Sequence, residues 1–361
     1  MFAGFYQGRR VLVTGHTGFK GAWLSLWLRH LGGDVHGLAL APPTEPSLHE
    51  LTEPGTFVSQ TDCDVRDLAA VESVLESVQP EFIFHLAAQS LVRRSYDDPM
   101  ETLSTNVFGT AHVLEATRRL NLICPVVVVT SDKCYENSGG DHSFEESDAL
   151  GGADVYSASK AAAEMVAHSW RRSFFERDGK LGPVATARAG NVIGGGDYAV
   201  DRIVPDAVRA LIAGEPVPVR NPAALRPWQH VIDCLSGYLW LGARMAEGNV
   251  GTTYNFGPDP AAQQIVQCLV EELLTHWPGE WTNLAENNPP PEAPRLSLAI
   301  DKAARELNWQ PVWNWETAVE QTAAWYRARH MEDASDLRAY SLAQIDRYGH
   351  DAAEAGQPWT A

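Results

Sequence analysis

A glycine-rich turn near the N-terminus restricts this chain to very few folds. Residues 10–14 (RVLVT) are typical of a buried strand, and residues 22–31 have the pattern of an apolar helix. The turn between them, GHTGFKG at residues 15–21, matches G-x-x-G-x-x-G. Glycines let the backbone approach a ligand closely, and a helix N-terminus attracts a pyrophosphate. We therefore predict a dinucleotide site here, and a purely structural turn is the alternative interpretation.

Strand and helix patterns alternate as far as residue 190. We predict strands at residues 10–14, 34–40, 56–59, 81–86, 126–129 and 183–189, and helices at residues 22–31, 68–78, 100–120 and 155–175. This alternation predicts an α/β fold with a right-handed, doubly wound parallel sheet of the Rossmann type.

The pattern becomes mixed after residue 190. We expect a dinucleotide-binding domain at residues 1–190, a smaller mixed substrate domain at residues 191–330 and a C-terminal extension at residues 331–361. Some later segments, such as residues 253–256, are expected to return to the first domain. Residues 287–294 are predicted to form a proline-rich linker, and residues 299–307 and 315–327 are predicted helices.

The composition excludes several classes of function. The formal net charge of -18 disfavours nucleic acid and anionic membrane as partners, because both are negatively charged. The five cysteines are scattered without a C-x-x-C pair, so we expect no disulfide framework, no zinc site and a reducing, cytoplasmic setting. No long apolar segment indicates a signal peptide or a membrane span.

The strand predicted at residues 126–129 ends abruptly in polar residues. Four valines are followed by Thr130, Ser131, Asp132 and Lys133. Ligands of open parallel sheets bind beyond the carboxyl ends of the strands. This stretch is therefore a candidate site, although polar loop residues follow most strands and are the plainer interpretation.

Tyr156 and Lys160 lie four residues apart on a predicted helix and so share one face. A tyrosine has an ordinary pKa of about 10, and a neighbouring lysine cation and an oxidised nicotinamide ring would both lower it. Tyr156 is therefore a candidate base for a sugar or alcohol hydroxyl, and Ser131 is a candidate hydrogen-bond donor to the same oxygen. A bare Y-x-x-x-K also occurs often by chance, so its order after the glycine turn and Ser131 carries the argument.

The second predicted strand lacks the acidic residue that often binds the cofactor ribose. It ends at Leu40 and continues to Thr44 without an Asp or Glu, so we expect Thr44 or backbone groups to serve the ribose. No arginine follows to bind a 2′-phosphate, which favours NAD over NADP.

These motifs together resemble the extended short-chain dehydrogenase/reductase superfamily, over about residues 9 to 330. The resemblance rests on TGHTGFKG at residues 14–21, HLAA at residues 85–88, Ser131, and Tyr156 with Lys160. More narrowly, residues 15–21, PPTEPSL at 42–48, SDK at 131–133 and RPWQH at 226–230 resemble the CDP-glucose 4,6-dehydratases. Relatives acting on dTDP- or GDP-sugars carry an acid pair where this chain has Asp132 and Lys133.

The resemblance implies a lyase that converts CDP-D-glucose to CDP-4-dehydro-6-deoxy-D-glucose and water, with NAD reduced and reoxidised in each turnover. In this scheme Tyr156 takes the proton of the 4-hydroxyl group. Lys133 removes the proton at carbon 5, and Asp132 protonates the departing 6-hydroxyl group. A close ion pair would oppose both roles, so we expect Asp132 and Lys133 to address different atoms of the sugar. The alternative for Lys133 is a positioning role.

The resemblance also suggests the residues that hold the ligands. The candidate cofactor-binding residues are Gly15, Thr17, Gly18, Phe19, Lys20, Gly21, Thr44, Asp64, Val65, Leu86, Ala87, Ala88, Gln89, Tyr156 and Lys160. The candidate substrate-binding residues are Arg93, Asn191, Arg202, Arg220, Arg226 and His230. Arginine forks match phosphate oxygens, whereas solvated surface charge is the alternative for each arginine. We expect His85 and His230 to be packed or to lie just behind the site, and no metal to be bound.

Partners and competing functions follow from the same features. Helices 100–120 and 155–175 carry apolar faces, and the equivalent pair forms a dimer interface in this superfamily, which implies a homodimer or a dimer of dimers. Purely intramolecular packing is the alternative. A nucleotide-sugar 4-epimerase would need Tyr156 and Ser131 but neither Asp132 nor Lys133. A dehydratase of another nucleotide-linked glucose and a non-catalytic NAD-sensing protein are the remaining alternatives.

Overall fold

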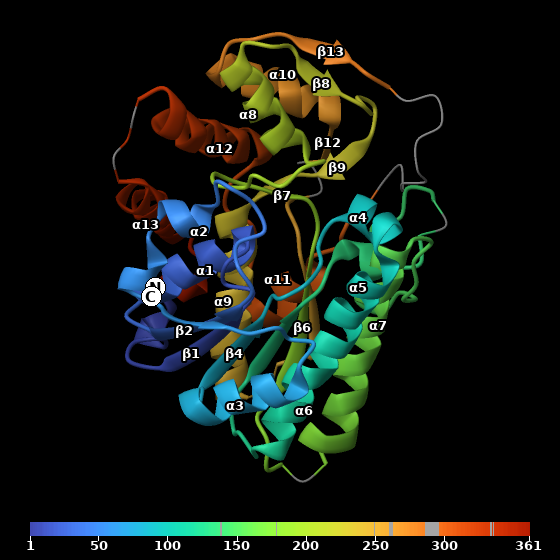
Figure 1. Cartoon of the computed structure of the whole chain (residues 1–361), viewed down its shortest axis with the longest axis vertical. Coiled ribbons are helices and arrows are strands. Elements are labelled where there is room, and N and C mark those ends of the chain that lie inside the picture. The colour runs from blue at the N-terminus through green and yellow to red at the C-terminus, as the bar shows by residue number, and fades with distance from the viewer. Residues whose placement is uncertain are drawn as a thin grey trace.

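The computed structural model describes residues 1–361 except 138, 178, 249, 260–262, 286–295, 333 and 335, so the predicted linker at residues 287–294 lies outside the described residues. Its main sheet has seven strands in the order β11-β6-β5-β4-β1-β2-β3, and every neighbouring pair is parallel (Figure 1). The strands are β1 (Arg10–Thr14), β2 (Asp34–Ala39), β3 (Ser59–Asp62), β4 (Phe82–His85), β5 (Val126–Val129), β6 (Val184–Ala189) and β11 (Thr253–Phe256). The predicted α/β fold with a parallel sheet is confirmed.

Every residue of β4, β5 and β6 is buried, because both faces of the sheet are covered. In β4, Phe82 and Phe84 face one hydrophobic core, and Ile83 between them faces the other. Val127 and Val128 of β5 divide between the two cores in the same way. Successive side chains of a strand point to opposite faces, so two buried faces require a continuous apolar run.

Helices pack on both faces of this sheet (Figure 1). The first core is covered by α1 (Phe19–His30), α9 (Val231–Glu247), α11 (Asp301–Leu307) and α13 (Leu337–Glu354). The second core is covered by α3 (Leu68–Val78), α6 (Gly109–Arg119) and α7 (Val155–Trp170). The C-terminal extension thus packs beside α1, and the backbone N–H of Ala3 donates to the carbonyl of Ala361 at 2.7 Å.

Three predicted elements differ from the observed ones. The strand expected at residues 56–59 is wrong in position: β3 lies at Ser59–Asp62, after a short 3-10 turn at Pro54–Thr56. All four residues of this edge strand are exposed, so no apolar pattern marks it. The helix expected at residues 100–120 is divided into α5 (Pro99–Leu103), a π-helical turn η3 (Ser104–Phe108) and α6. The helix expected at residues 155–175 ends in a second π-helical turn, η5 (Arg171–Phe175).

A smaller group of elements lies beyond the carboxyl ends of the strands, at the top of Figure 1. It contains α8 (Ile203–Ala213), β8 (Val217–Val219), β9 (Leu225–Pro227), β12 (Gln263–Ile265), α10 (Val266–His276), β13 (Trp281–Asn283) and α12 (Trp315–His330). The strand pairs are β8 with β13, β9 with β12, and β7 (Val192–Ile193) with β10 (Gln229–His230). After β10 and α9, the chain returns to the main sheet, where β11 pairs with β6. The domain limits themselves stay a prediction.

The remaining short elements are η1 (Phe2–Gly4), α2 (Leu48–Leu51), α4 (Val92–Asp97), η4 (Asp132–Cys134) and η7 (Pro358–Thr360). Among the described residues, no helix is both long and apolar enough to cross a membrane.

Candidate active site

The end of β5 places a buried acid beside a serine. Asp132 begins the short turn η4 and is 3 % exposed, and its Oδ1 accepts a hydrogen bond from the Ser131 hydroxyl at 3.0 Å. Its other oxygen, Oδ2, is buried and has no hydrogen-bond partner in the described part of the chain. Burial raises the pKa of Asp132, against the opposing charge of Lys133. The raised pKa is the direction that a proton donor needs.

Tyr156 and Lys160 lie in the first turns of α7 and are both buried. The helix begins after Asp154, whose carboxylate accepts a hydrogen bond from the Ser157 N–H at 2.9 Å. Burial and, to a smaller extent, the charge of Lys20 lower the pKa of Lys160 to about 8. The Lys160 ammonium donates to the carbonyl of Val129 at 3.5 Å. The helix thereby holds its lysine against the end of β5.

Burial raises the pKa of Tyr156 to about 12 in the protein alone. The predicted lowering by a lysine cation and an oxidised nicotinamide ring concerns the cofactor-bound protein and stays a prediction. A hydrogen bond with Ser131 and the charge of Arg202 both lower this pKa, but burial outweighs them. Ser131 therefore contacts both Tyr156 and Asp132, and it joins the two parts of the predicted site.

The glycine turn has room only for glycine at two positions. Gly15 has a φ of 74°, and a Cβ there would lie 2.7 Å from the backbone nitrogen of Ala87. A Cβ on Gly21 would collide with the carbonyl of Gly15. Gly18 caps α1 without a side-chain hydrogen bond, and α1 continues with Phe19 and Lys20. This cradle of bare backbone at a helix N-terminus fits a dinucleotide pyrophosphate.

The neighbouring strand ends offer mainly backbone groups. Thr17 donates to the carbonyl of Leu40 at 3.0 Å, and Thr44 is half-buried a few residues farther on. The backbone N–H of Ala87 donates to the Thr14 hydroxyl at 3.2 Å. Leu86 and Ala88 flank Ala87 at the end of β4 and are partly exposed.

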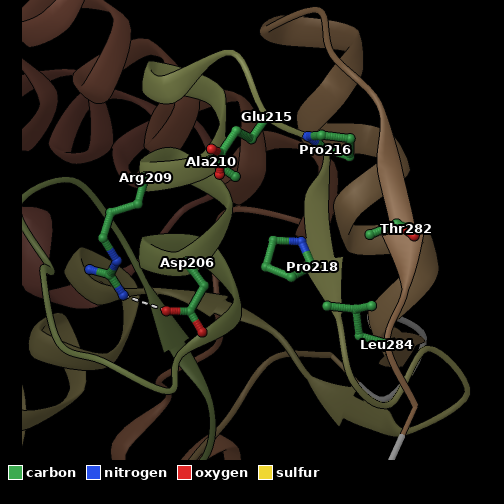
Figure 2. Close-up of a pocket in the computed structure, with 8 residues that line it drawn as sticks. All are labelled: Asp206, Arg209, Ala210, Glu215, Pro216, Pro218, Thr282 and Leu284. Atoms are coloured by element: carbon green, nitrogen blue, oxygen red, sulfur yellow. Dashed lines mark hydrogen bonds and ion pairs between the residues drawn. The ribbon is translucent and has the colours of Figure 1, made fainter.

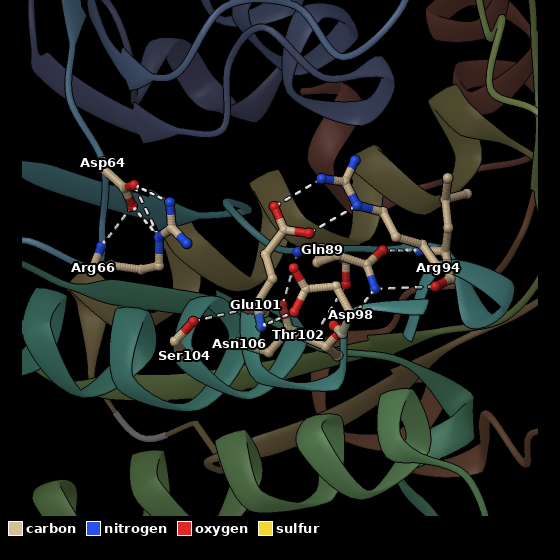
Figure 3. A network of polar contacts seen from close by, with 10 residues as sticks. Asp64, Arg66, Gln89, Arg94, Asp98, Glu101, Thr102, Ser104 and Asn106 are labelled. Carbon is tan, nitrogen blue, oxygen red and sulfur yellow. Dashed lines mark hydrogen bonds and ion pairs between the residues drawn. The ribbon is translucent and has the colours of Figure 1, made fainter. Parts of the chain in front are cut away.

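Asp64 and Val65 lie after β3 in different surroundings. The carboxylate of Asp64 forms an ion pair with Arg66 at 2.6 Å, and this partner holds the pKa of Asp64 below its usual range (Figure 3). Val65 is buried, and its carbonyl contacts the His112 ring at 2.9 Å.

Asn106 is a residue that sequence analysis missed. Its Oδ1 accepts from the Gln89 N–H at 2.9 Å, and its amide donates to the Gln89 carbonyl at 3.0 Å and to the Ser159 hydroxyl at 2.8 Å (Figure 3). Ser159 lies between Tyr156 and Lys160 on α7. Asn106 thus ties the end of β4 to α7, and no local sequence pattern predicts these contacts.

Two predicted arginines reach the site from the smaller group of elements. Arg202 contacts Asp197 at 2.9 Å and donates to Ser90 at 3.3 Å, and its charge acts on Tyr156. Arg226 is buried on β9, and its charge lowers the pKa of Asp132. Charge from these two guanidinium groups therefore acts on Tyr156 and on Asp132, respectively.

The remaining predicted arginines lie farther out. Arg220 forms ion pairs with Asp201 at 2.5 Å and Asp206 at 3.2 Å, and Arg93 approaches Asp201 at 4.0 Å. The neighbouring Arg94 pairs with Glu101 at 2.8 Å (Figure 3). The carbonyl of Asn191 accepts the Gln229 N–H at 3.2 Å.

His230 lies in the core rather than on the site surface. It is fully buried, its Nδ1 accepts the Ile232 N–H at the start of α9, and its ring packs edge-on against Trp23 and Trp313. Burial lowers its pKa to about 3, so the imidazole is neutral. The predicted substrate contact of His230 is without structural support. His85 is likewise buried, with a pKa of about 3, between Thr14 and Thr110.

A cavity of about 490 Å³ lies outside this site, between α8, β8 and β13 (Figure 2). It is lined by Asp206, Arg209, Ala210, Glu215, Pro216, Pro218, Thr282 and Leu284. None of these is a predicted site residue. Across the described ranges, no cluster of three His, Cys, Asp or Glu side chains is arranged to hold a metal ion.

The sheet order, and the position of Tyr156 beside a strand-end serine, place the chain in the class of NAD-dependent epimerases and dehydratases. The family model described as GDP-mannose 4,6 dehydratase matches residues 12–322, and the chain belongs to this family. It is 43 % identical over 338 residues to CDP-glucose 4,6-dehydratase of Salmonella typhimurium (strain LT2), covering 90 % of this chain and 92 % of that protein.

Two solved structures show the same fold. That of dTDP-glucose 4,6-dehydratase from Streptomyces venezuelae, with NAD and TYD bound, has a TM-score of 0.76 and 26 % identity, covering 88 % of this chain and 97 % of that one. That of UDP-glucose 4-epimerase from Thermotoga maritima with UDP-glucose has a TM-score of 0.77 and 20 % identity, covering 89 % and 99 %. Since a dehydratase and an epimerase fit equally well, the fold alone does not separate the two activities.

Proposed function

We propose that this protein catalyses the NAD-dependent dehydration of CDP-D-glucose to CDP-4-dehydro-6-deoxy-D-glucose and water. The observation that carries the proposal is the buried carboxyl group of Asp132, which contacts Ser131 and leaves Oδ2 without a partner in the described structure. An epimerase needs no proton donor at this position, whereas a dehydratase must protonate a leaving hydroxyl group. The choice of CDP rests on the similarity to the Salmonella enzyme.

The glycine turn and the N-terminus of α1 would hold the pyrophosphate of NAD, and the backbone at Ala87 would lie against the cofactor. Thr17, which donates to the carbonyl of Leu40 just after β2, and the half-buried Thr44 would serve the ribose. The chemistry that NAD supplies when bound is reversible hydride transfer, from carbon 4 of the hexose and then to carbon 6.

Oxidation at carbon 4 requires a base for the 4-hydroxyl proton. Tyr156 takes this proton, and Ser131, which already contacts the Tyr156 hydroxyl, holds the same substrate oxygen. The pKa of about 12 in the protein alone is too high for this task near neutral pH. The positive ring of the cofactor and the Lys160 ammonium act in the lowering direction.

Elimination follows at carbons 5 and 6. Lys133 removes the proton at carbon 5, which the 4-keto group makes acidic, and carbon 5 is reprotonated when carbon 6 receives the hydride. Asp132 gives its proton to the departing 6-hydroxyl group through the unpartnered Oδ2. Arg202 and Arg226 bind the diphosphate, because guanidinium forks match phosphate oxygens. Arg93, Arg220 and Asn191 would contact the remainder of the nucleotide sugar.

A parallel incubation of the protein and NAD⁺ with CDP-, dTDP-, GDP- and UDP-glucose tests the proposal. We expect a 4-keto product that is lighter than its substrate by one water, from CDP-glucose. An unchanged mass with inversion at carbon 4 would indicate an epimerase, and a 4-keto product from only a non-CDP sugar would reject CDP. Binding of NAD without turnover of any of the four sugars would favour the sensing protein.

The assembly that we propose is a homodimer, or a dimer of such dimers. Large apolar side chains are exposed on neighbouring helices: Met100 and Phe108 on the α5–η3 side, and Met165 and Phe174 on α7–η5. Their exposed fractions are 69 %, 60 %, 54 % and 41 %. A second copy of the chain would cover them, as the equivalent helices do in the superfamily. A single-chain mass by light scattering at micromolar concentration would contradict the dimer.

A further inference from the structure

A buried acid on the catalytic helix holds the first residue of the polar segment that follows β5. Glu164 lies one helical turn beyond Lys160 and two beyond Tyr156, and it is 3 % exposed. Its carboxylate accepts a short hydrogen bond from the Thr130 hydroxyl and a second, at 2.8 Å, from Thr186. The start of residues 130–135, the segment that carries Ser131, Asp132 and Lys133, is therefore attached to α7.

The far end of the same segment is held by Arg188. This arginine of β6 donates to Glu164 at 2.8 Å and to the Tyr135 hydroxyl at 2.7 Å, and it is 3 % exposed. Its guanidinium carbon also lies 4.8 Å from the centre of the Tyr135 ring. The Tyr135 hydroxyl in turn donates to Asn255 at 2.7 Å, and Asn255 is the residue paired with Arg188 across β6 and β11.

This arrangement needs a reason other than stability. Taking a carboxylate and a guanidinium out of water is costly, and a buried ion pair is often no more stable than apolar residues of the same volume. Here Glu164 and Arg188 form hydrogen bonds to the two ends of residues 130–135. Glu164 also shares a helix face with Tyr156 and Lys160. The pair thereby fixes the segment of Asp132 relative to the helix of Tyr156.

We propose that Glu164 and Arg188 are positioning residues, which set the separation between the oxidation pair on α7 and the elimination residues of the 130–135 segment. The inference rests on the proposed dehydration, in which both groups must reach one hexose. A displacement of about 1 Å in such an arrangement can lower a rate roughly a hundredfold.

Two nearly isosteric substitutions test the inference without removing a buried charge. Thr130→Val breaks the contact with Glu164, and Tyr135→Phe breaks the contacts with Arg188 and Asn255. Matched controls are Thr117→Val, which breaks a buried hydrogen bond inside α6, and Tyr254→Phe, which breaks the contact of a buried tyrosine with Glu306 on the opposite side of β11. Each variant is compared with the wild type for Tm, kcat, KM and the deuterium isotope effect from substrate labelled at carbon 5.

We expect Thr130→Val and Tyr135→Phe each to lower kcat about tenfold or more, with KM within about twofold of the wild type. The isotope effect at carbon 5 should rise, because elimination becomes slower relative to the other steps. Both controls should keep kcat and the isotope effect of the wild type at a similar Tm. Wild-type kcat and isotope effect in both test variants would overturn the inference.

The double variant Glu164→Leu/Arg188→Met keeps the test decisive if a single change perturbs folding. It removes both charges together, so no unpaired charge remains buried. A folded double variant with a native Tm and an unchanged KM should still lose at least tenfold in kcat, and a wild-type kcat would refute the positioning role. Absence of water loss in the wild type itself would instead reject the proposed function.

Discussion

Gly190 lies directly against Asp132. A Cβ atom at Gly190 would come 3.0 Å from Oδ2 of Asp132 and 3.0 Å from Cγ of Pro227. Oδ2 is the carboxyl oxygen that has no hydrogen-bond partner in the described structure. The glycine that follows β6 therefore keeps space next to the one oxygen that our mechanism assigns to the leaving hydroxyl group.

The substitution Gly190→Ala should lower kcat for dehydration about tenfold, because the new methyl group crowds the oxygen that must reach the substrate. Steady-state assays of CDP-4-dehydro-6-deoxy-glucose formation measure this change. Gly257→Ala is the matched control, since a Cβ there would meet its nearest atom at an ordinary 3.4 Å. Equal losses in both variants would mean that the proximity of Gly190 to Asp132 has no special effect.

The substitution Lys133→Met should stop water loss while leaving oxidation at carbon 4 possible. Methionine keeps the length of the side chain but cannot remove the proton at carbon 5, and losing a general base costs roughly 10²–10⁴ in rate. Absorbance of the reduced nicotinamide reports the oxidation, and product mass reports the water loss. Dehydration at a near-normal rate in this variant would show that Lys133 is not the base.

The substitution Gly15→Ala should weaken NAD binding. The new Cβ would lie 2.7 Å from the backbone nitrogen of Ala87, and the alanine would have to adopt a positive φ. Overpacking of this kind costs about 1–3 kcal/mol. Isothermal titration with NAD⁺ measures the affinity. Gly214→Ala, at the end of α8, shares the positive φ of 69° but would meet no atom within 4 Å, so it should bind NAD normally. Unchanged affinity in Gly15→Ala would contradict the proposed cofactor cradle.

The buried Asp233 should make stability depend on pH. It accepts hydrogen bonds from the Val312 N–H at 2.9 Å and the Tyr348 hydroxyl at 2.6 Å, yet burial raises its pKa from the ordinary value of 3.8 to about 6. A pKa that is higher in the folded state means that stability is fully present below about 4 and falls as pH rises through about 6. The free energy of unfolding decreases by about 3 kcal/mol over this pH range.

This pH effect is isolated by comparing the wild type with Asp233→Asn, which cannot titrate at that position. The Tm of the wild type minus that of the variant should decrease between about pH 4 and pH 7. Parallel Tm curves for the two proteins would contradict the prediction.

The substitution Met165→Lys should shift the protein toward single chains. A lysine ammonium in the centre of an apolar interface is buried at a high desolvation cost. Light scattering measures the mass, and Ile212→Lys on α8 is the control, because Ile212 is 50 % exposed outside the α5–α7 face. A dimer of unchanged stability in Met165→Lys would place the interface elsewhere.

Several errors of the sequence-based predictions have one cause, which is that the deciding partner is remote in the chain. The π-helical turn at Ser104–Phe108 contains Asn106, and this residue bonds to Gln89 and Ser159. Local periodicity describes the helix but contains nothing about those partners. The pKa of Tyr156 in the protein alone depends in the same way on remote residues, since burial is set by everything packed around the side chain.

The sequence by itself determined the parallel sheet, because strands with near-continuous apolar runs that alternate with helices have few other ways to bury both faces. It also determined the order of the chemical groups: the glycine turn, the segment Ser131–Asp132–Lys133, and Tyr156 with Lys160. Only the tertiary structure decided how they meet. Three contacts join residues that are tens of positions apart: Ser131 with Tyr156, Gly190 with Asp132, and Glu164 and Arg188 with the 130–135 segment. Spacing along the chain cannot specify such distances.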